Sequence, residues 1–526
     1  MAAYSFGILT CLSAIVLAAL AVVMFLHDFK HQFCAMLHHG SYALLTFAGA
    51  ASTQTTSNKV DLSWYPPKQT QINNLTAVMA GEGTYGWIYN SSETPDDRYG
   101  TYNWCNMPHV RKQEYVIPSS EYNLIYVELI HRHHKRTPYS SNSFPVEPYP
   151  WNCDDVAIFH HSQPLNSTST PPSIIPAYWK LYSSPISPFA PQGWTGTCQF
   201  PQITLAGLSD SHRHGSDLFS VYGPLLSLSD PGSIQFRVTT NPITTQVAGA
   251  VLPNFFTSSS PPPSPSLPSY APLLVQQPQL DSLEPKYACP LSSSLFSSLQ
   301  SPSNTRWQSH LSAAAPLFRS LDSVSGVPAG DKGFHASMDH YYDNLSARQC
   351  HGLPSPCSLA EPPSSCITQA QTDLVYRLGQ WEYDHVYRSG GPDTLRASSA
   401  SMGVWFAELA ENLRGAAAAA NTGEGEVKVK YRHNIAHDGS LSRVLSVLQV
   451  DEMVWPGMGA EVVFELYEKI NNPESYFVRV LWGGRVLRSS NPSLGVMDMV
   501  DLDLVLGYFD GLVGEKAEKV KGLCGL

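Results

Sequence analysis

Residues 123–130, NLIYVELI, form a nearly continuous run of apolar, β-branched and aromatic side chains. A run of this length and composition is typical of a strand that is buried on both faces of a sheet. Further strands are predicted at residues 233–239, 426–431, 461–467 and 476–482, and helical patterns separate them. Strands that alternate with helices at both ends of a chain predict an α/β fold.

Helical periodicity dominates the middle of the chain. Between about residues 275 and 415 apolar side chains recur at helical spacing, as in the sets Ala370, Leu374, Leu378, Trp381 and Met402, Trp405, Phe406, Leu409, Leu413. Two earlier helices are predicted, over residues 205–222 and from Asn241 and Pro242 through residue 252. We therefore expect one α/β domain in two parts, residues 52–256 and 416–526, interrupted by a Pro/Ser-rich insertion at 257–270 and an α-helical cap region at 271–415.

The composition excludes two broad classes of protein. The 526 residues carry a formal net charge of −11, which argues against nucleic acid as a partner. Hydrophobic residues make up 43% of the chain and charged residues 14%, so a wholly disordered chain is also excluded. The remaining class is a folded, loop-rich globular protein.

The N-terminus predicts entry into the secretory pathway. Residues 4–26 contain no charge and are long enough to cross a bilayer as a helix. A shorter apolar stretch at 42–51, preceded by Met36, resembles the core and cleavage site of a signal peptide. Residues 1–51 are therefore either a signal anchor or a signal peptide. The protein is expected to be membrane-anchored with a lumenal or extracellular domain, or else secreted.

Cysteines and glycosylation sequons agree with that compartment. Apart from Cys11 and Cys34, the chain has eight cysteines, an even number that suits disulfide bonds in an oxidising environment, although their connectivity stays open. None of the eight forms a C-x2-C pair, so a zinc site of that type has little support. Sequons occur at Asn74, Asn90, Asn166 and Asn344.

A basic and histidine-rich segment follows the predicted strand 123–130. It reads HRHHKRTP over residues 131–138. Loops at the carboxyl ends of strands are where α/β sheets bind ligands. Arg132 and Arg136 can each donate two parallel hydrogen bonds to phosphate oxygens. The alternation of histidines with basic side chains argues against a metal, so we predict an anion site and no metal or other cofactor.

A second cluster follows the predicted strand 426–431, where residues 432–440 read RHNIAHDGS before an amphipathic helix. Arg132-His133-x-x-Arg136-x-Pro138 resembles the R-H-G-x-R-x-P signature of the histidine acid phosphatases, in the phytase-like clade of the branched histidine phosphatase superfamily. His437-Asp438 resembles the H-D motif of that family, and residues 203–208 resemble its L-T-x-x-G segment, which opens the first helix. The resemblance covers roughly residues 120–515.

The resemblance implies a fold and a set of roles. The fold is a three-layer, phosphoglycerate-mutase-like α/β domain with an inserted α-helical cap. His133 would attack phosphorus and become a phosphohistidine, and Asp438 would protonate the leaving alcohol. Arg132, Arg136 and His437 would bind the phosphate oxygens of a phosphomonoester substrate. No metal takes part in this mechanism.

The chain departs from the family pattern at two positions. His134 replaces the glycine of the signature, where its imidazole would either crowd the loop or add a hydrogen-bond donor. Ile243 replaces a second phosphate-binding arginine, so Arg237 is the candidate substitute. From the motif position we expect the Ile243 side chain to face the phosphate, although its spacing with Val247 and Val251 is also that of an apolar stripe in the core.

A literal R-H-G sequence at residues 213–215 is rejected as the signature. It lies within the predicted helix 205–222, where His214 falls about 120° away from the apolar stripe, so we expect it on a solvated face. The prediction from sequence is a secreted or anchored acid phosphatase. Its alternative is a catalytically impaired protein of the same fold that binds phosphorylated ligands.

Overall fold

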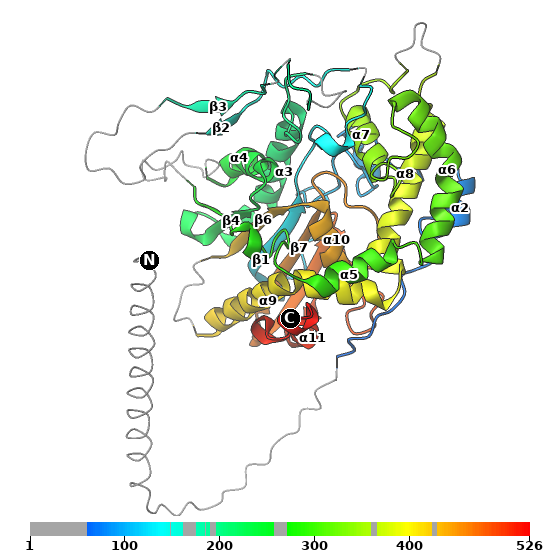
Figure 1. The fold of residues 1–526 in the computed structure, drawn as a ribbon. Coiled ribbons are helices and arrows are strands. Elements are labelled where there is room, and N and C mark those ends of the chain that lie inside the picture. The colour runs from blue at the N-terminus through cyan, green and yellow to red at the C-terminus, as the bar shows by residue number, and fades with distance from the viewer. Residues whose placement is uncertain are drawn as a thin grey trace, which may run out of the picture. The chain divides into compact units, whose positions relative to one another are not determined.

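A mixed β-sheet forms the centre of the computed structural model, which describes residues 60–526 except 148, 161–174, 183, 185, 190–195, 257–270, 359–364 and 423–428 (Figure 1). Among the described residues the sheet has eight strands in the order β10-β8-β7-β1-β6-β4-β5, with β9 paired to β8. The strands are β1 (Tyr122–Arg132), β4 (Ile234–Val238), β5 (Leu273–Leu274), β6 (Tyr431–Ala436), β7 (Glu461–Lys469), β8 (Asn472–Trp482), β9 (Arg485–Val486) and β10 (Val500–Asp501). Strands β1, β6, β4 and β5 run parallel, whereas β7, β8 and β10 join them in antiparallel fashion. The α/β class predicted from the sequence is confirmed.

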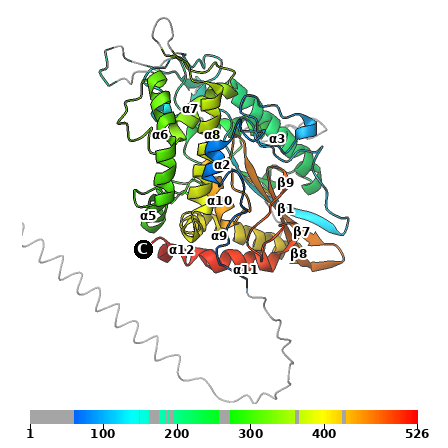
Figure 2. The same cartoon turned by 90° about the vertical axis from the view of Figure 1, so that its right-hand side faces the viewer.

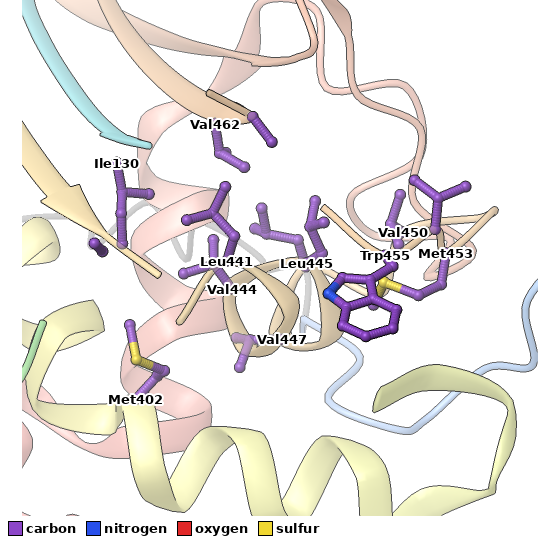
Figure 3. Packing of buried hydrophobic residues seen from close by; sticks show 14 of the residues in the cluster. Ile130, Met402, Leu441, Val444, Leu445, Val447, Val450, Met453, Trp455 and Val462 are labelled. Atoms are coloured by element: carbon purple, nitrogen blue, oxygen red, sulfur yellow. The ribbon is translucent and has the colours of Figure 1, made fainter. Parts of the chain in front are cut away.

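Helices cover both faces of this sheet (Figures 1 and 2). On one face, α3 (Leu205–Leu226) and α4 (Pro242–Phe256) pack on β1, β4 and β6 through one apolar cluster. On the other face, α9 (Pro392–Thr422), α10 (Asp438–Val447) and α11 (Leu502–Val513) pack on β1, β7 and β8 through a second, larger cluster. Figure 3 shows α10 in that second core, with Leu441, Val444 and Leu445 beside Ile130 of β1 and Val462 of β7.

The remaining helices gather at one side of the sheet, beyond α10 (Figure 1). They are α2 (Leu75–Ala80), α5 (Pro290–Leu299), α6 (Thr305–Ser325), α7 (Asp339–Cys350) and α8 (Gln369–Asp384), and the short α12 (Val520–Leu523) closes the chain. The segment before β1 joins this group, because Trp104 and Tyr102 lie in the same core as Tyr342 and Tyr376. The predicted helical middle of the chain is confirmed. A small hairpin of β2 (Ile158–His160) and β3 (Ala177–Trp179) stands apart from the sheet.

One predicted strand is displaced. The sequence predicts a strand at 426–431 and a loop after it, but β6 spans Tyr431–Ala436 and pairs with both β1 and β4. The prediction missed β6 because it contains Arg432, His433 and Asn434, and polar side chains are rare in the central strand of a parallel sheet. Asn434 is nevertheless satisfied there, because its amide donates to Glu128 at 3.1 Å and to the Leu129 carbonyl at 3.0 Å. Residues 426–428 lie outside the described part.

Eight cysteines pair as Cys105–Cys350, Cys153–Cys198, Cys289–Cys524 and Cys357–Cys366. Four disulfides fit an oxidising secretory or extracellular environment. One sequon is excluded as a glycan site, because Asn344 is fully buried in α7 and donates to the Asn142 carbonyl at 3.0 Å. Asn74 and Asn90 are exposed, and Asn166 lies outside the described residues.

Within the described residues, no helix combines the length and the apolar character that a bilayer crossing requires. The predicted signal anchor or signal peptide at 1–51 and the insertion at 257–270 both lie outside those residues.

Candidate active site

Two neighbouring parallel strands bring the sequence-predicted residues together. Arg132 at the end of β1 is in register with Ala436 at the end of β6, so the chain leaves both strands at the same edge of the sheet. His133 follows β1 and His437 follows β6, and their ring centroids lie 5.5 Å apart in an edge-to-face arrangement. Residues about 300 positions apart in the sequence therefore form one cluster.

His133 is held in one orientation by its own loop. Its Nδ1 lies 3.0 Å from the carbonyl oxygen of His134, and because a carbonyl only accepts, Nδ1 carries the proton. Burial lowers the pKa of His133 well below its usual value, and the charges of Arg136 and Arg132 lower it further. His133 is thus a neutral imidazole whose Nε2 lone pair is free. Nε2 has no hydrogen bond within the described residues.

Arg132 points to the α10 side of the sheet. Its Nη1 donates to the Pro456 carbonyl at 2.6 Å, and its guanidinium lies over the Trp104 ring, 4.7 Å from the ring centroid. Its Nη2 lies 3.2 Å from a carboxylate oxygen of Asp438. The guanidinium is therefore fixed in position by a carbonyl and an aromatic face, and one edge of it is directed at the site.

Arg136 is anchored by a residue of the cap region. Its Nη1 donates to Asp343 of α7 at 3.0 Å and to the Thr137 carbonyl at 2.8 Å. The same Asp343 accepts from the Tyr139 backbone at 3.1 Å and from the Asn142 amide at 2.9 Å. This carboxylate ties the loop after β1 to α7, and it leaves Nη2 of Arg136 without a partner among the described residues.

Asp438 is the first residue of α10, and it is partly exposed. Its Oδ2 accepts from the Trp455 indole at 2.8 Å and from the Tyr383 hydroxyl at 3.2 Å, and its Oδ1 accepts from the Gly439 backbone at 2.8 Å. Burial disfavours its ionised form, but Arg132 and the Trp455 hydrogen bond outweigh burial and lower the pKa of Asp438 to about 2. Asp438 is therefore ionised in the free protein.

His437 is held by the segment that follows β4. Its Nε2 lies 3.1 Å from the Thr239 hydroxyl and 3.5 Å from a carboxylate oxygen of Glu284. Burial lowers the pKa of His437, and the nearby carboxylates of Glu284 and Asp438 oppose that effect. A phosphate anion in the cluster would add to the carboxylates and favour the charged imidazolium, which could then donate to a phosphate oxygen.

The first turn of α3 supports the loop that follows β1. Thr204 caps α3 by accepting from the Gly207 backbone, as the predicted helix start requires. A Cβ built at Gly207 would lie 2.0 Å from the Lys135 carbonyl oxygen. Glycine is therefore required at residue 207 because the loop backbone packs directly on the helix.

Arg237 and Ile243, which lie where the chain departs from the family pattern, make their contacts outside the cluster of His133 and His437. Arg237 on β4 donates to Glu408 at 2.8 Å and to the Ser282 hydroxyl at 2.7 Å, and it lies 3.6 Å from Asp281. Ile243 is fully buried in α4, in the same apolar cluster as Val247 and Val251. The expectation that Ile243 faces the phosphate is wrong, because the second residue of α4 points into the core between α3, α4 and the sheet.

The expectation for His214 is also wrong. Instead of facing solvent, His214 is fully buried. Its Nε2 lies 2.9 Å from Glu461 and its Nδ1 lies 3.2 Å from Nε2 of His134. The spacing of apolar residues in the helix could not predict this burial, because a polar side chain can also face the core where it hydrogen-bonds to another buried polar group. His131, His134 and His214 form the one group among the described residues whose ligand atoms are grouped closely enough to hold a metal ion.

Several residues of the site carry no signal in the sequence. Asp343, Tyr383 and Trp455 touch the predicted residues directly, but they lie in three separate segments and in no recognisable motif. The Trp455 and Tyr383 rings stack with centroids 3.9 Å apart, so they form one aromatic wall beside Asp438. Together with Asp438, the cluster offers a neutral nucleophile, two arginines and a carboxylate. This set can act on a phosphate ester.

Comparison of the fold with solved structures finds similar proteins. Crystal structures of phytases from Klebsiella sp. ASR1 and Hafnia alvei match with TM-scores of 0.45 and 0.48 and sequence identities of 15% and 12%. The matches cover 77% and 76% of this chain and 96% and 99% of those chains. A Bifidobacterium longum multiple inositol polyphosphate phosphatase in complex with inositol hexasulfate matches with a TM-score of 0.40 and 11% identity, over 73% of this chain and 92% of that one.

The phytase-like resemblance indicated by the motifs thus has counterparts among the solved structures. No protein-family model matches the sequence, and no curated protein matches it either. At identities of 15% or less and TM-scores below 0.5, these similarities carry no information about the reaction or the substrate.

Proposed function

We propose that the protein is an acid phosphatase that hydrolyses phosphomonoesters through a phosphohistidine intermediate on His133. One observation carries the proposal. A buried neutral imidazole, with its Nδ1 bound to a carbonyl and its Nε2 free, lies between Arg132, Arg136 and the His437–Asp438 pair. A nucleophile, cationic phosphate ligands and a carboxylic acid are what phosphoryl transfer to a side chain requires.

In the first half-reaction, His133 Nε2 attacks phosphorus in line with the ester oxygen. The N–P bond forms as the P–O ester bond breaks. Asp438 transfers its proton to the departing oxygen, so that an alcohol leaves rather than an alkoxide. Arg132, Arg136 and His437 stabilise the charge on the three non-bridging oxygens. Most of their contribution is electrostatic and depends on their fixed positions.

In the second half-reaction, water attacks the phosphohistidine. Asp438, now a carboxylate, accepts a proton from that water while the N–P bond breaks, and inorganic phosphate leaves. The reaction thereby returns His133 to its neutral form and Asp438 to its acid form. No metal is needed, because the arginines and His437 balance the charge of the phosphoryl group.

The pKa of Asp438 has to rise before it can act as the acid. In the free protein, Arg132 and the Trp455 indole hold its pKa at about 2. A bound phosphate monoanion or dianion would take up part of the positive charge of Arg132, which then stabilises the Asp438 carboxylate less. The phosphate would also repel that carboxylate. Both effects raise the pKa of Asp438. The proton could arrive on the monoanionic substrate, whose second ionisation lies near pH 6.

The direct test is hydrolysis of p-nitrophenyl phosphate by the purified protein at acidic pH in the presence of a chelator. We expect turnover, at a rate reduced by the absence of the arginine that Ile243 replaces. Loss of one preorganised donor typically costs about 10²–10³-fold in rate. Folded wild-type protein that hydrolyses neither aryl nor alkyl phosphates would contradict the proposal.

Asp438→Asn should slow the hydrolysis of poor leaving groups more than that of good ones. An alkoxide must be protonated as it departs, whereas a nitrophenolate is stable as an anion. We expect a loss of at least about 10²-fold for an alkyl phosphate and a clearly smaller loss for p-nitrophenyl phosphate. The ratio of the two losses in a single preparation serves as its own control. Equal losses would assign Asp438 a role in shaping the site and not in proton transfer.

The lowered pKa of His133 should extend activity far into the acidic range. A histidine whose pKa lies below 6.5 stays neutral, and therefore nucleophilic, as the pH falls through that value. In a plot of log kcat/KM against pH, the acidic limb should lie well below pH 6.5. Above about pH 6 the rate should fall as the substrate loses its second proton. An acidic limb at pH 6.5 or higher would contradict a buried, neutral nucleophile.

The alternative function is a catalytically impaired protein of this fold that binds phosphorylated ligands. Two observations favour it. Ile243 is buried where the resembled family has a phosphate-binding arginine, and Arg132 and Arg136 already pair with Asp438 and Asp343. Saturable binding of inorganic phosphate without turnover of any monoester would select this alternative.

We further propose that the architecture is the three-layer, phosphoglycerate-mutase-like fold with an inserted α-helical cap. In this proposal α5 to α8 belong to the cap, and the second part of the α/β domain begins with α9 at Pro392, because α9 packs on the sheet, and not at residue 416 as expected from the sequence. Residues 1–51 would deliver the chain to the secretory pathway as a signal anchor or a signal peptide, which agrees with the four disulfides.

A further inference from the structure

The three imidazoles of His131, His134 and His214 converge behind the loop that carries His133. All three are fully buried, and one nitrogen from each lies within 4.8 Å of the others. His131 comes from β1, His134 from the loop after it and His214 from the middle of α3. This cluster is separate from the proposed phosphate site, because side chains of adjacent strand residues point to opposite faces of the sheet. Arg132 faces the phosphate site, and His131 faces α3.

Three of the six ring nitrogens of this cluster have no hydrogen-bond partner among the described residues, whereas Nε2 of His134 pairs with Nδ1 of His214, and Nε2 of His214 pairs with Glu461. Neither ring nitrogen of His131 has a hydrogen-bond partner within the described residues, and Nδ1 of His134 has none either. Buried polar atoms are nearly always paired, so unpaired ones require an explanation.

The geometry of His134 and His214 fits two ligands of one metal ion. Nδ1 of His214 lies 3.2 Å from Nε2 of His134. Two nitrogens bound tetrahedrally to zinc, each at 2.0–2.1 Å, lie about 3.3 Å apart. Gly459 provides the room for this arrangement, because a Cβ there would lie 2.7 Å from Nε2 of His134.

A carboxylate supports His214 from behind. Its Nε2 lies 2.9 Å from Oε2 of Glu461, and Oε1 of Glu461 accepts from the Val110 backbone at 2.6 Å. The carboxylate places the proton on Nε2 of His214 and directs Nδ1 at His134. A carboxylate–histidine–metal arrangement of this kind orients the ligand and increases its basicity.

The basic side chains that argued against a metal in the sequence point elsewhere. Arg132 binds the Pro456 carbonyl, Lys135 pairs with Asp210 at 3.1 Å, and Arg136 pairs with Asp343 at 3.0 Å. Alternation along β1 and the turn after it separate these cations from the imidazoles. The repulsion expected from the sequence is therefore absent in the fold.

We propose that His131, His134 and His214 form a buried site for a borderline divalent cation, with zinc as the best match to three neutral imidazoles. The ion would be structural. It would fix His134, whose carbonyl accepts from Nδ1 of His133 at 3.0 Å, and it would join α3 to the end of β1. The site does not depend on the proposed phosphatase activity.

The test uses tag-free full-length protein, stripped with a chelator and then given Zn²⁺ or Co²⁺. We expect about one Zn²⁺ per chain after gel filtration, and visible d–d absorption of tetrahedral Co²⁺ in the cobalt form. The unfolding temperature should rise by roughly 3 °C at a hundredfold excess over Kd. Retention of less than about a tenth of an ion per chain would overturn the proposal, whatever the phosphatase assay shows.

Variants identify the ligands. His131→Leu should keep the fold and abolish stoichiometric binding, and Glu461→Gln should weaken binding by roughly 10–100-fold while keeping an acceptor for Val110. His212→Ala, an exposed histidine on the same helix as His214, is the matched control and should bind as the wild type does. Circular dichroism verifies that each variant is folded. A folded His131→Leu protein that binds Zn²⁺ as tightly as the wild type would overturn the assignment.

Discussion

Replacement of His133 by alanine is expected to abolish the hydrolysis of every phosphomonoester. The substitution removes the proposed nucleophile, and the neighbouring groups cannot replace it. Arg132 and Arg136 are cations, and Nε2 of His437 is engaged by Thr239 at 3.1 Å. We expect a fall in kcat of at least about 10³-fold, measured with both aryl and alkyl phosphates. Rapid quenching of the wild type with labelled substrate should place the phosphate on the peptide that contains His133.

His212→Ala is the control for this variant, because His212 is exposed on α3 and belongs to no site. It should retain wild-type activity. His214→Ala is unsuitable as a control, since it removes a buried partner of Glu461 and so lowers stability. A folded His133→Ala protein with near-wild-type turnover would show that another residue receives the phosphoryl group, and the assignment of the motif would be wrong.

Ile243→Arg is expected to destabilise the protein severely and not to raise turnover. Ile243 is fully buried and shares one apolar cluster with Val247, Val251 and Phe236. A guanidinium placed there would be buried without a counter-ion, which costs about 3–5 kcal/mol in the free energy of unfolding. Denaturant unfolding of the purified variant measures this loss.

Thr245→Arg provides the matched comparison, because Thr245 is exposed two residues further along α4. It introduces the same charge at the surface, so its unfolding free energy should stay within about 0.5 kcal/mol of the wild type. The opposite result for Ile243→Arg, a stable variant with faster turnover, would mean that the side chain reaches the phosphate. In that case an arginine at residue 243 would leave the core, although isoleucine is buried there.

Much of the fold could be predicted from local patterns. The apolar run that becomes β1 and the amphipathic stripe that becomes α10 are read directly from residue periodicity. The helix start at Thr204 was also predictable, because capping is a local interaction between a side chain and the next turn. Strand β6 was displaced in the prediction because its polar side chains face satisfied polar partners and not solvent.

In the candidate site, too, local features were predictable from the sequence and long-range contacts were not. The sequence placed His133 after one strand and His437 after another, and parallel pairing of β1 with β6 then brings their rings to 5.5 Å. It could not reveal that Asp343 of α7 anchors Arg136 or that Trp455 donates to Asp438, because each contact joins segments far apart in the chain. The pKa of Asp438, about 2, depends on those contacts as well.

By itself the sequence located the buried strand β1 and the two segments, rich in histidine and arginine, that contain His133 and His437. Tertiary structure alone decided which way Ile243 and His214 point, and that three histidines from two segments converge. The physical reason is that periodicity reports only whether a residue can share a face with its own neighbours. Whether that face meets apolar side chains, as for Ile243, or a buried carboxylate, as for His214, is decided by the element packed against it.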